Sequence, residues 1–328
     1  MRTGIGVPAG LDRSEISGTV GTVATDSQRE QRPDTATLAA FTVAVILGGG
    51  NAPAIRYLSC QSCELDPLWA AAQRFLLASA LLTVVAAVVH APLPRSRGLV
   101  GAITFGVLQF GAGFGLIYQG LVRAPAGLGQ VLIALVPMLT FGLALAHRQE
   151  RFRWDGLLGA ILALAGIAVV FHSGLDEGVP FASMAWILAG AGCWAEALVV
   201  VKAFPKVHPI ALNAVAMGVG GLVLCVVSVI SEETWAVPDS TRTWLAQAYL
   251  IIPGSIGVFL LYVFVLRAWT ASAASYQLVL IPLVTVPVSA WLQNELITWS
   301  FAVGAVLVLV GVYVGALKRP GNHDRGRS

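Results

Sequence analysis

Two charged side chains lie inside otherwise apolar segments of this sequence, where they could do chemistry. Glu196 lies within the apolar run 181–201, and Arg74 lies near the beginning of the run 67–90. A charged group in hydrocarbon costs about 2.5 kcal/mol or more, so we expect each to face a cavity or a partner. Because burial disfavours its charged form, Glu196 suits proton coupling or contact with a cationic substrate. The alternatives for Glu196 are a protonated packing residue and a residue near the cytoplasmic end with access to water.

Arg74 and Asn51 are candidates for a binding site. Arg74 could bind the carboxylate of a substrate, or it could instead snorkel to the interface or pair with Asp66. Asn51 follows a Gly-Gly-Gly run and precedes Pro53, a composition that favours a local break in a helix. Freed backbone groups are tolerated in a membrane only where they line protein or a watery cavity. We therefore favour a cavity-lining role for Asn51 over a plain kink.

Uncharged polar side chains lie at matching depths in several other apolar runs. Each could offer a hydrogen bond or a stacking face to a small polar substrate. Each could equally join two helices, at about 0.6 kcal/mol per hydrogen bond on average. Because a lipid-facing Gln is costly, we interpret the set together as the lining of a polar cavity. Its members are Gln109, Tyr118, Gln119, Gln130, Trp194, Tyr262, Tyr276 and Gln277.

The residue types of common enzyme sites lack the spacing that catalysis needs. The histidines lie near the ends of apolar runs or in the C-terminal tail, and none forms an HExxH pair. The sequence has no GxSxG motif, P-loop or carboxylate dyad. Cys60-Gln-Ser-Cys63 is a lone CxxC without the second ligand pair of a zinc site. We predict no enzyme activity, no metal and no cofactor, and keep a membrane-embedded enzyme as the less favoured alternative.

Composition identifies the elements that must position these residues. Apolar residues make up 57% of the 328 residues and charged residues 11%, with a mean hydropathy of +0.79. A soluble domain normally carries about 25% charged residues, so most of this surface must face lipid. A net charge of +3 without a basic run argues against nucleic-acid binding. Ten apolar runs are long enough to span a bilayer: about 36–55, 67–90, 99–121, 124–146, 155–172, 181–201, 208–230, 244–266, 270–292 and 298–317.

The distribution of basic residues predicts which side of the membrane each connection faces. With the N-terminus inside, the cytoplasmic segments hold 16 of the 20 Lys and Arg residues, and the outer connections hold three. This bias towards the cytoplasmic side predicts that both termini lie in the cytoplasm. We expect a multi-pass protein of the plasma membrane, with a disordered cytoplasmic tail at 1–35 and a second tail at 319–328.

The second half of the membrane region repeats the first. Residues 135–170 align without a gap on 280–315 at an offset of 145, and 11 of the 36 pairs are identical. The predicted repeats, 36–172 and 181–318, have five spans each. Because five is odd, the second repeat must enter the membrane from the opposite side. The prediction is an all-α membrane protein of ten transmembrane helices in two inverted five-helix repeats, with a binding site between them.

These motifs resemble the EamA-type branch of the drug/metabolite transporter superfamily over about residues 36–318. In repeat 1 the resemblance rests on Gly50–Arg56, Gln73–Phe75 and Glu150–Trp154, and in repeat 2 on His208-Pro209 and Glu295–Trp299. It implies a lipid-embedded carrier of small metabolites, amino acids or drugs, often working by proton-linked export and alternating access. A passive facilitator or uptake permease of the same fold is the alternative.

Two further paired features are interpreted as structural. Glu150 and Glu295 each precede a span, where an acid complements the helix dipole and caps free N–H groups. The fifth and tenth spans each carry small residues on one face, which allow close packing within the chain or across a homodimer. A homodimer through these two spans is therefore a further expectation. The small residues are Gly156, Gly159, Ala163, Gly304 and Gly311.

Overall fold

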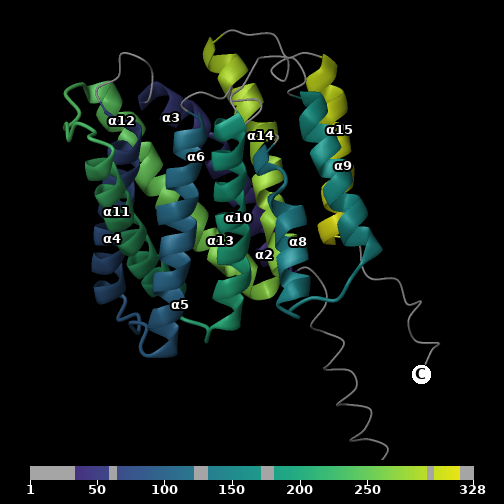
Figure 1. The fold of residues 1–328 in the computed structure, drawn as a ribbon, viewed down its shortest axis with the longest axis horizontal. Coiled ribbons are helices and arrows are strands. Elements are labelled where there is room, and N and C mark those ends of the chain that lie inside the picture. Colours follow the sequence, from purple (N-terminus) through teal and green to yellow (C-terminus); the bar gives the residue numbers. More distant parts are fainter. Residues whose placement is uncertain (1–33, 59–64, 122–131, 171–180, 294–298, 318–328) are drawn as a thin grey trace, which may run out of the picture. The chain divides into compact units, whose positions relative to one another are not determined.

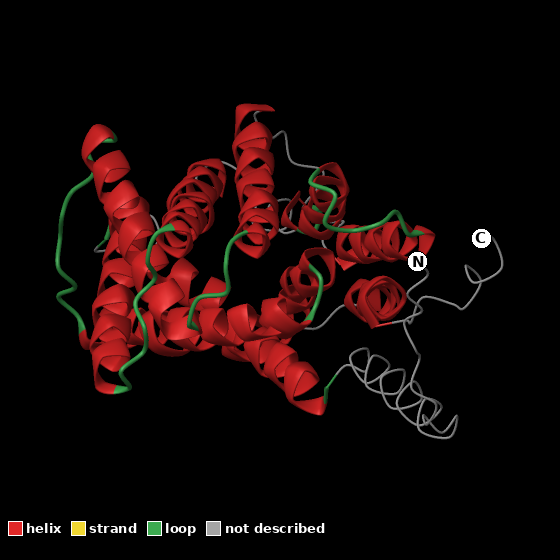
Figure 2. Cartoon of the chain, turned by 90° about the horizontal axis from the view of Figure 1, so that it is seen from below, coloured by secondary structure: helices red, strands yellow, loops and turns green. Residues whose placement is uncertain are grey.

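The computed structural model describes residues 34–58, 65–121, 132–170, 181–293 and 299–317. The chain divides into two units, Met1–Ala36 and Thr37–Ser328, and the architecture considered below belongs to the second. Figure 2 shows helices joined by loops, with no strand in the described ranges. The tails predicted at 1–35 and 319–328 lie almost wholly outside these ranges.

Ten helical segments follow the ten predicted spans. Within the described ranges, seven helices are long and apolar enough to cross a membrane, and three shorter apolar helices complete the set. The predicted class, an all-helical membrane protein with ten spans, is confirmed. In chain order (Figure 1) the first five spans are α2 (Thr35–Gly49) with α3 (Asn51–Leu58), α4 (Pro67–Val88), α5 (Arg97–Phe105) with η2 (Gly106–Gly113) and α6 (Phe114–Leu121), α8 (Val136–Ala146), and α9 (Trp154–Val170). The last five spans are α10 (Phe181–Ala203), α11 (Pro209–Ile230), α12 (Thr241–Ile251) with η4 (Ile252–Gly257) and α13 (Val258–Ala268), α14 (Ala271–Gln293), and α15 (Trp299–Val312) with η5 (Tyr313–Leu317).

The second and seventh spans, α4 and α11, begin and end in the same way. Each starts with a proline, Pro67 or Pro209, whose missing N–H is harmless in the first turn of a helix. Each has 22 residues and is followed by a residue with a left-handed backbone, His90 (φ 52) or Glu232 (φ 56). The next amide then donates to a carbonyl oxygen five residues earlier, which satisfies the helix end. The two helices are therefore equivalent members of the repeats.

The third and eighth spans both widen into a π-helix at the same place in the repeat. Adding the offset of 145 to η2, which covers 106–113, gives 251–258, and this range encloses η4 at 252–257. Glycines are frequent in both segments, and Pro253 in η4 has no N–H to donate to a helical ladder. Because π-helical turns occur often at functional sites, these two segments mark where a site is expected.

The contacts between helices keep their pattern when the two repeats are exchanged. α4 packs on η4, and its equivalent α11 packs on η2. Similarly, α3 packs on α12, and α10 packs on α5, the equivalent of α12. The equivalent helices α4 and α11 pack together, as do α8 and α14, and α9 and α15 lie side by side (Figure 1). The two repeats are thus interlocked, as two inverted repeats are when a binding site lies between them.

The small-residue face of the fifth span, α9, is covered within the chain by α15. A Cβ added at Gly159 would lie 2.4 Å from the Cα atom of Gly315, and one added at Gly311 would lie 2.5 Å from the nitrogen of Ala163. These glycines therefore let two helix backbones approach closely. Of the two predicted uses of this face, packing within the chain is the one observed. A homodimer remains a prediction for the outer faces of these helices, where large apolar side chains are exposed.

Two carboxylates cap the N-terminal ends of helices that lie far from them in the sequence. Glu150 accepts hydrogen bonds from the amide (3.1 Å) and the hydroxyl group (2.5 Å) of Ser272, at the beginning of α14. Glu233 accepts hydrogen bonds from the amides of Leu68 (3.1 Å) and Trp69 (2.8 Å), at the beginning of α4. Glu150 therefore caps a helix, but that helix is the ninth span rather than the fifth. Glu295 lies outside the described residues.

Candidate functional site

Arg74 is a buried cation at a junction between the two repeats. It is the eighth residue of α4, and only 1% of its surface is exposed. Its Nε donates to the hydroxyl group of Ser255 (2.6 Å), and its Nη2 donates to the carbonyl oxygen of Gly254 (2.9 Å), both in η4. Its Nη1 is buried and has no hydrogen-bond partner within the described ranges. The guanidinium group thus keeps a donor for a further acceptor.

The charge of Arg74 is not offset by a carboxylate of the described residues. The ring centroids of Phe75 and Phe114 lie 5.1 and 5.7 Å from its Cζ atom, within the range of cation–π attraction. Asp66, which could have paired with it, instead accepts two hydrogen bonds of 2.7 Å from Thr234. Arg74 therefore neither snorkels nor pairs with that acid, and the junction keeps a positive charge.

The break between α2 and α3 in the first span lies against η4, the π-helix that accepts the hydrogen bonds of Arg74. α2 ends at Gly49 and α3 begins at Asn51, so the break falls within the glycine run. The side-chain nitrogen of Asn51 donates to the carbonyl oxygen of Gly254 (3.1 Å), which also accepts from Arg74. Oδ1 of Asn51 is buried and unpaired in the described part of the chain. Glycine at position 254 leaves room for this side chain, because an added Cβ would lie 2.1 Å from that oxygen.

Two tyrosines complete the surroundings of Arg74. The hydroxyl group of Tyr249 donates to the carbonyl oxygen of Leu47 (2.8 Å), next to the break in the first span. Tyr249 and Tyr118 both lie close enough to the guanidinium group to interact with it electrostatically, and Tyr118 is also within hydrogen-bonding reach of it. Tyr118 belongs to the predicted set, whereas Tyr249 and Ser255 do not. The run Pro-Gly-Ser-Ile-Gly, which follows Tyr249 closely and resembles the break in the first span, is the signal that could have identified them.

An equivalent junction joins the sixth span to the third. Trp194 of α10 donates from Nε1 to the backbone carbonyl oxygen of Gln109 in η2 (2.9 Å). Its ring packs on Phe114 with 5.0 Å between centroids, and a Cβ added at Gly113 would lie 2.2 Å from it. Gln109 and Gly254 are 145 positions apart. The backbone carbonyl group at this position of each repeat therefore accepts a hydrogen bond from a side chain.

The buried cation, in contrast, occupies one of two equivalent helix positions and not the other. Because α4 and α11 begin with equivalent prolines, the eighth residues of the two helices are equivalent: Arg74 in α4 and Ala216 in α11. Ala216 packs so closely on η2 that a Cβ added at Gly106 would lie 2.5 Å from its carbonyl oxygen. One junction is thus a tight contact between backbones, while the other contains a guanidinium group. Close packing of this fold does not by itself require the cation.

Three further residues of the predicted set are buried with unused polar atoms. Each keeps a side-chain oxygen that finds no hydrogen-bond partner among the residues described. Buried polar atoms are normally paired, so unpaired ones indicate a place for a polar ligand or for water. The three residues are Gln109, Tyr262 and Gln277.

Other members of the predicted set have different surroundings. Tyr276 joins helices, because its hydroxyl group donates to the carbonyl oxygen of Gly156 in α9 (3.1 Å). Helix joining was the alternative role considered for it. Gln119 is exposed on α6. Gln130, like the Cys60–Cys63 motif, lies outside the described residues.

Glu196 is not part of the Arg74 junction and pairs with a histidine instead. Its Oε1 lies 3.1 Å from Nε2 of His147, the residue that follows α8. The side chains of Glu196 and His147 are 28% and 42% exposed, and Oε2 of Glu196 is buried without a partner in the described ranges. Nearby, Gln149 donates to the carbonyl oxygen of Val199 (2.8 Å). This arrangement matches the alternative of an acid near a span end, now beside a second titratable group.

Two interlocked repeats with buried polar groups at their junctions define a membrane transporter of the inverted-repeat class. The chain belongs to the EamA-like transporter family, whose model matches residues 35–172 and 181–316. The inner membrane transporter YedA of Escherichia coli (strain K12) is 28% identical over 260 residues, covering 76% of this chain and 83% of that protein. The transporter YvbV of Bacillus subtilis (strain 168) is 26% identical over 294 residues, covering 86% and 92%.

One relative carries a substrate in its name, the "probable terminal-alkyne amino-acid exporter" of Streptantibioticus cattleyicolor. It is 30% identical over 118 residues, covering 36% of this chain and 39% of that protein. A solved crystal structure superimposes with a TM-score of 0.71 at 19% identity, covering 87% of this chain and 99% of the other, which shows the fold. The family identifies a multi-pass transporter of a small molecule in a lipid bilayer, a class that is generally not enzymatic.

Proposed function

We propose that this transporter exports small carboxylate-bearing compounds, such as amino acids, other metabolites or drugs, by alternating access. In the proposed orientation both termini are cytoplasmic, since 16 of the 20 basic residues then lie inside. The two repeats, 36–172 and 181–318, would move against each other about the junctions described above. A passive facilitator or an uptake permease is the alternative, and a membrane-embedded enzyme is less favoured.

The observation that carries this proposal is the buried guanidinium group of Arg74 with its unpaired Nη1. Burial of an unpaired charge costs several kcal/mol, so an anion that enters this junction would be bound strongly. A carboxylate matches the geometry of a guanidinium group and forms short, charge-assisted hydrogen bonds with it. The name of the Streptantibioticus cattleyicolor relative, an amino-acid exporter, is consistent with such a substrate.

The neighbouring amide and hydroxyl groups would recognise the rest of the substrate. Asn51 has a free oxygen next to Arg74, where it can accept a hydrogen bond from an ammonium or hydroxyl group. Tyr118 lies close to the same guanidinium group. An acid binding at Arg74 and a donor binding at Asn51 would together select compounds that carry both groups. α-Amino acids are the simplest such compounds.

Glu196 and His147 are proposed as the site of proton coupling. The pair joins α10 of one repeat to the end of α8 in the other. A change in protonation would change the attraction between these two helices, which would link the proton to movement of the repeats. The spare oxygen of Glu196 would offer a second point of contact for a proton or a cation.

A comparison of metabolites in spent medium tests the proposal. Cells would express the wild type, Arg74→Gln or Glu196→Gln at equal membrane abundance, with Arg95→Gln as the control because that side chain is exposed. We expect one or more carboxylates to be enriched outside cells with the wild type and the control, but not with Arg74→Gln. Enrichment by Arg74→Gln at the wild-type level would contradict the proposal, and depletion of the medium would favour uptake.

A further inference from the structure

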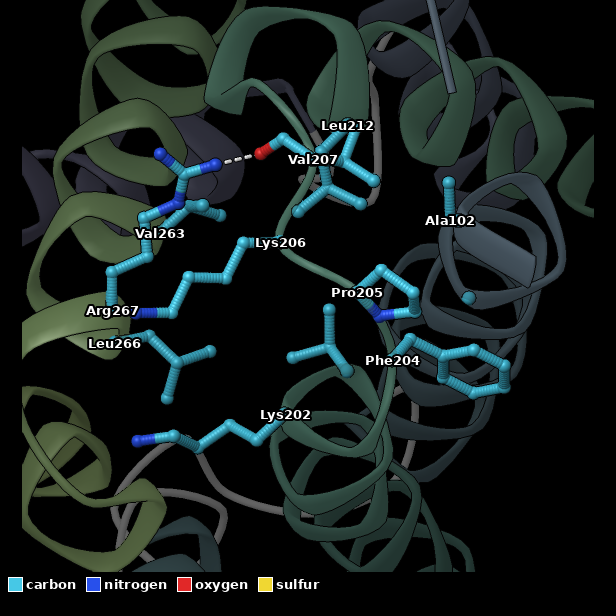
Figure 3. Close-up of a pocket in the computed structure, with 13 residues that line it drawn as sticks. Ala102, Lys202, Phe204, Pro205, Lys206, Val207, Leu212, Val263, Leu266 and Arg267 are labelled. Atoms are coloured by element: carbon cyan, nitrogen blue, oxygen red, sulfur yellow. Dashed lines mark hydrogen bonds between the residues drawn. The ribbon is translucent and has the colours of Figure 1, made fainter. Parts of the chain in front are cut away.

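A pocket that is separate from the Arg74 junction opens at the ends of α5, α10, α11 and α13 (Figure 3). It has a volume of about 80 Å³ and is lined by three cationic side chains, Lys202, Lys206 and Arg267. Lys202 belongs to the last turn of α10, Lys206 to the connection between α10 and α11, and Arg267 to the last turn of α13. None of the residues that surround Arg74 lines this pocket.

The three cations are not neutralised by an ion pair in the described part of the chain. Lys202 donates to the carbonyl oxygen of Trp269, and Arg267 donates to that of Val207, so two of them are held by neutral groups. Glu150 attracts Lys202 and Lys206 repels it, so one acid acts on the cluster from outside the pocket lining. The pocket therefore keeps an excess of positive charge.

The remaining walls of the pocket are mostly apolar. Figure 3 shows the charged ends of Lys202 and Lys206 extending towards α13, which carries Arg267, while Ala102 and Phe204 lie across the opening. Val263, Leu266 and Leu212 add to the apolar lining. A cationic side facing an apolar side fits an amphiphile whose anionic head binds the cations and whose hydrocarbon part lies on the walls.

We propose that this pocket binds the phosphate group of an anionic amphiphile, of which a membrane phospholipid is the most abundant source. Lysine is a suitable ligand because its ammonium group acts as a point charge towards phosphate, and arginine can bind the same group with two donors. Basic pockets between transmembrane helices on the cytoplasmic side are known sites for acidic headgroups. The pocket lies on that side in the orientation inferred from charge.

A bound phosphate would bridge the cationic side chains of three segments at this end of the bundle. α10, α13 and the 204–208 connection would then share one anion, which would hold the ends of the third, sixth, seventh and eighth spans together. Binding would therefore stabilise the protein against heat. A phosphate that bridges these ends would also favour the conformation in which they lie close together.

Native mass spectrometry of the purified full-length protein tests this site. The protein would be incubated with phosphatidylglycerol or phosphatidylcholine of the same acyl chains, and the bound lipid would be counted for the wild type, Lys206→Gln and Lys202→Gln/Lys206→Gln. Arg95→Gln is the control for loss of one exposed charge on the same side. We expect phosphatidylglycerol binding to fall about tenfold in the double variant and several-fold in Lys206→Gln, but not in the control.

A competition with glycerol 3-phosphate identifies the source of the phosphate. Failure of millimolar glycerol 3-phosphate to displace the lipid supports a membrane lipid, and full displacement supports a soluble organic phosphate at the same cations. Equal binding of the two lipids, or equal binding of phosphatidylglycerol by all variants, would overturn the site. Lys206→Gln keeps the test valid if the double variant fails to fold, because Lys206 is exposed and makes no hydrogen bond in the described structure.

Discussion

The backbone carbonyl groups of Gln109 and Gly254 occupy the same place in the two repeats. Each accepts a hydrogen bond from the first span of the other repeat. The donor to Gln109 is Nε1 of Trp194 (2.9 Å), and the donor to Gly254 is Nδ2 of Asn51 (3.1 Å). Both carbonyl groups belong to π-helical segments, η2 and η4. One junction contains a buried cation, Arg74, and the other consists of close backbone contact.

This relationship suggests how the two halves exchange roles. In an inverted repeat, a junction that is tight in one conformation is expected to be loose in the other. The hydrogen bonds made by Asn51 and Trp194 should then favour opposite conformations of the transporter. Each contributes about 0.5–1.5 kcal/mol, which is enough to shift a conformational equilibrium by roughly two- to tenfold.

Replacing Gly254 with Ala should damage the junction between the first and eighth spans. The new Cβ would lie 2.1 Å from Oδ1 of Asn51, so either the Asn51 side chain must give up its position or the two helices must separate. We expect transport to be lost and the free energy of unfolding to fall by about 1–3 kcal/mol. Gly142→Ala is the matched control, since nothing lies within 4 Å of the Cβ that it adds. Thermal unfolding in detergent measures both, and equal stability of the two variants would contradict the contact.

Asn51→Ala and Trp194→Phe should shift the transporter in opposite directions. Each change removes one donor from equivalent carbonyl groups, so each destabilises the conformation in which its own junction is tight. Pulsed electron paramagnetic resonance between spin labels at the two ends of the bundle would report the populations. A shift of both variants in the same direction would show that the two junctions do not alternate.

The sequence predicts more of the fold than of the site, for physical reasons. Ten apolar runs and the 145-residue repeat specify the helices because lipid demands long apolar segments, and this part is confirmed. Arg74 and Asn51 could be selected because a charge and a glycine-rich break are rare inside a span. The π-helices could not, and Ser255 and Tyr249 are indicated only by the neighbouring run Pro-Gly-Ser-Ile-Gly, because small and aromatic residues are common throughout the membrane region. Whether Tyr276 faces a cavity or Gly156 depends on rotation of α14, which composition does not determine.

Arg74→Met should separate function from stability. A long apolar side chain fills similar space and removes the cost of burying a charge that no carboxylate of the described residues offsets. We therefore expect an unchanged or raised melting temperature together with loss of carboxylate transport. Arg95→Gln, at an exposed position, should change neither quantity. A large loss of stability in Arg74→Met would instead indicate that the guanidinium group is needed for folding.

Glu196→Gln should remove the dependence of transport on pH while leaving the fold intact. The carboxylate pairs with His147 at a position that is partly exposed, so its loss leaves no deeply buried charge unpaired. His147→Gln should weaken the pH dependence, because it removes the second titratable group of the pair. Efflux from vesicles at several pH values measures this, with Glu232→Gln as an exposed control. A pH profile of Glu196→Gln identical to that of the wild type would exclude the pair from coupling.

The proposed role of Arg74 is tested most directly by a thermal-shift screen with paired ligands. Each pair would consist of a carboxylate and its neutral amide, for example an amino acid and its amide, added to purified wild type and to Arg74→Gln. Binding to the folded state raises the melting temperature, so the screen can detect a substrate that has not been identified beforehand. We predict that some carboxylates, and not their amides, stabilise the wild type and that Arg74→Gln loses this response. Equal stabilisation by the amides, or an undiminished response in Arg74→Gln, would contradict a carboxylate site at Arg74.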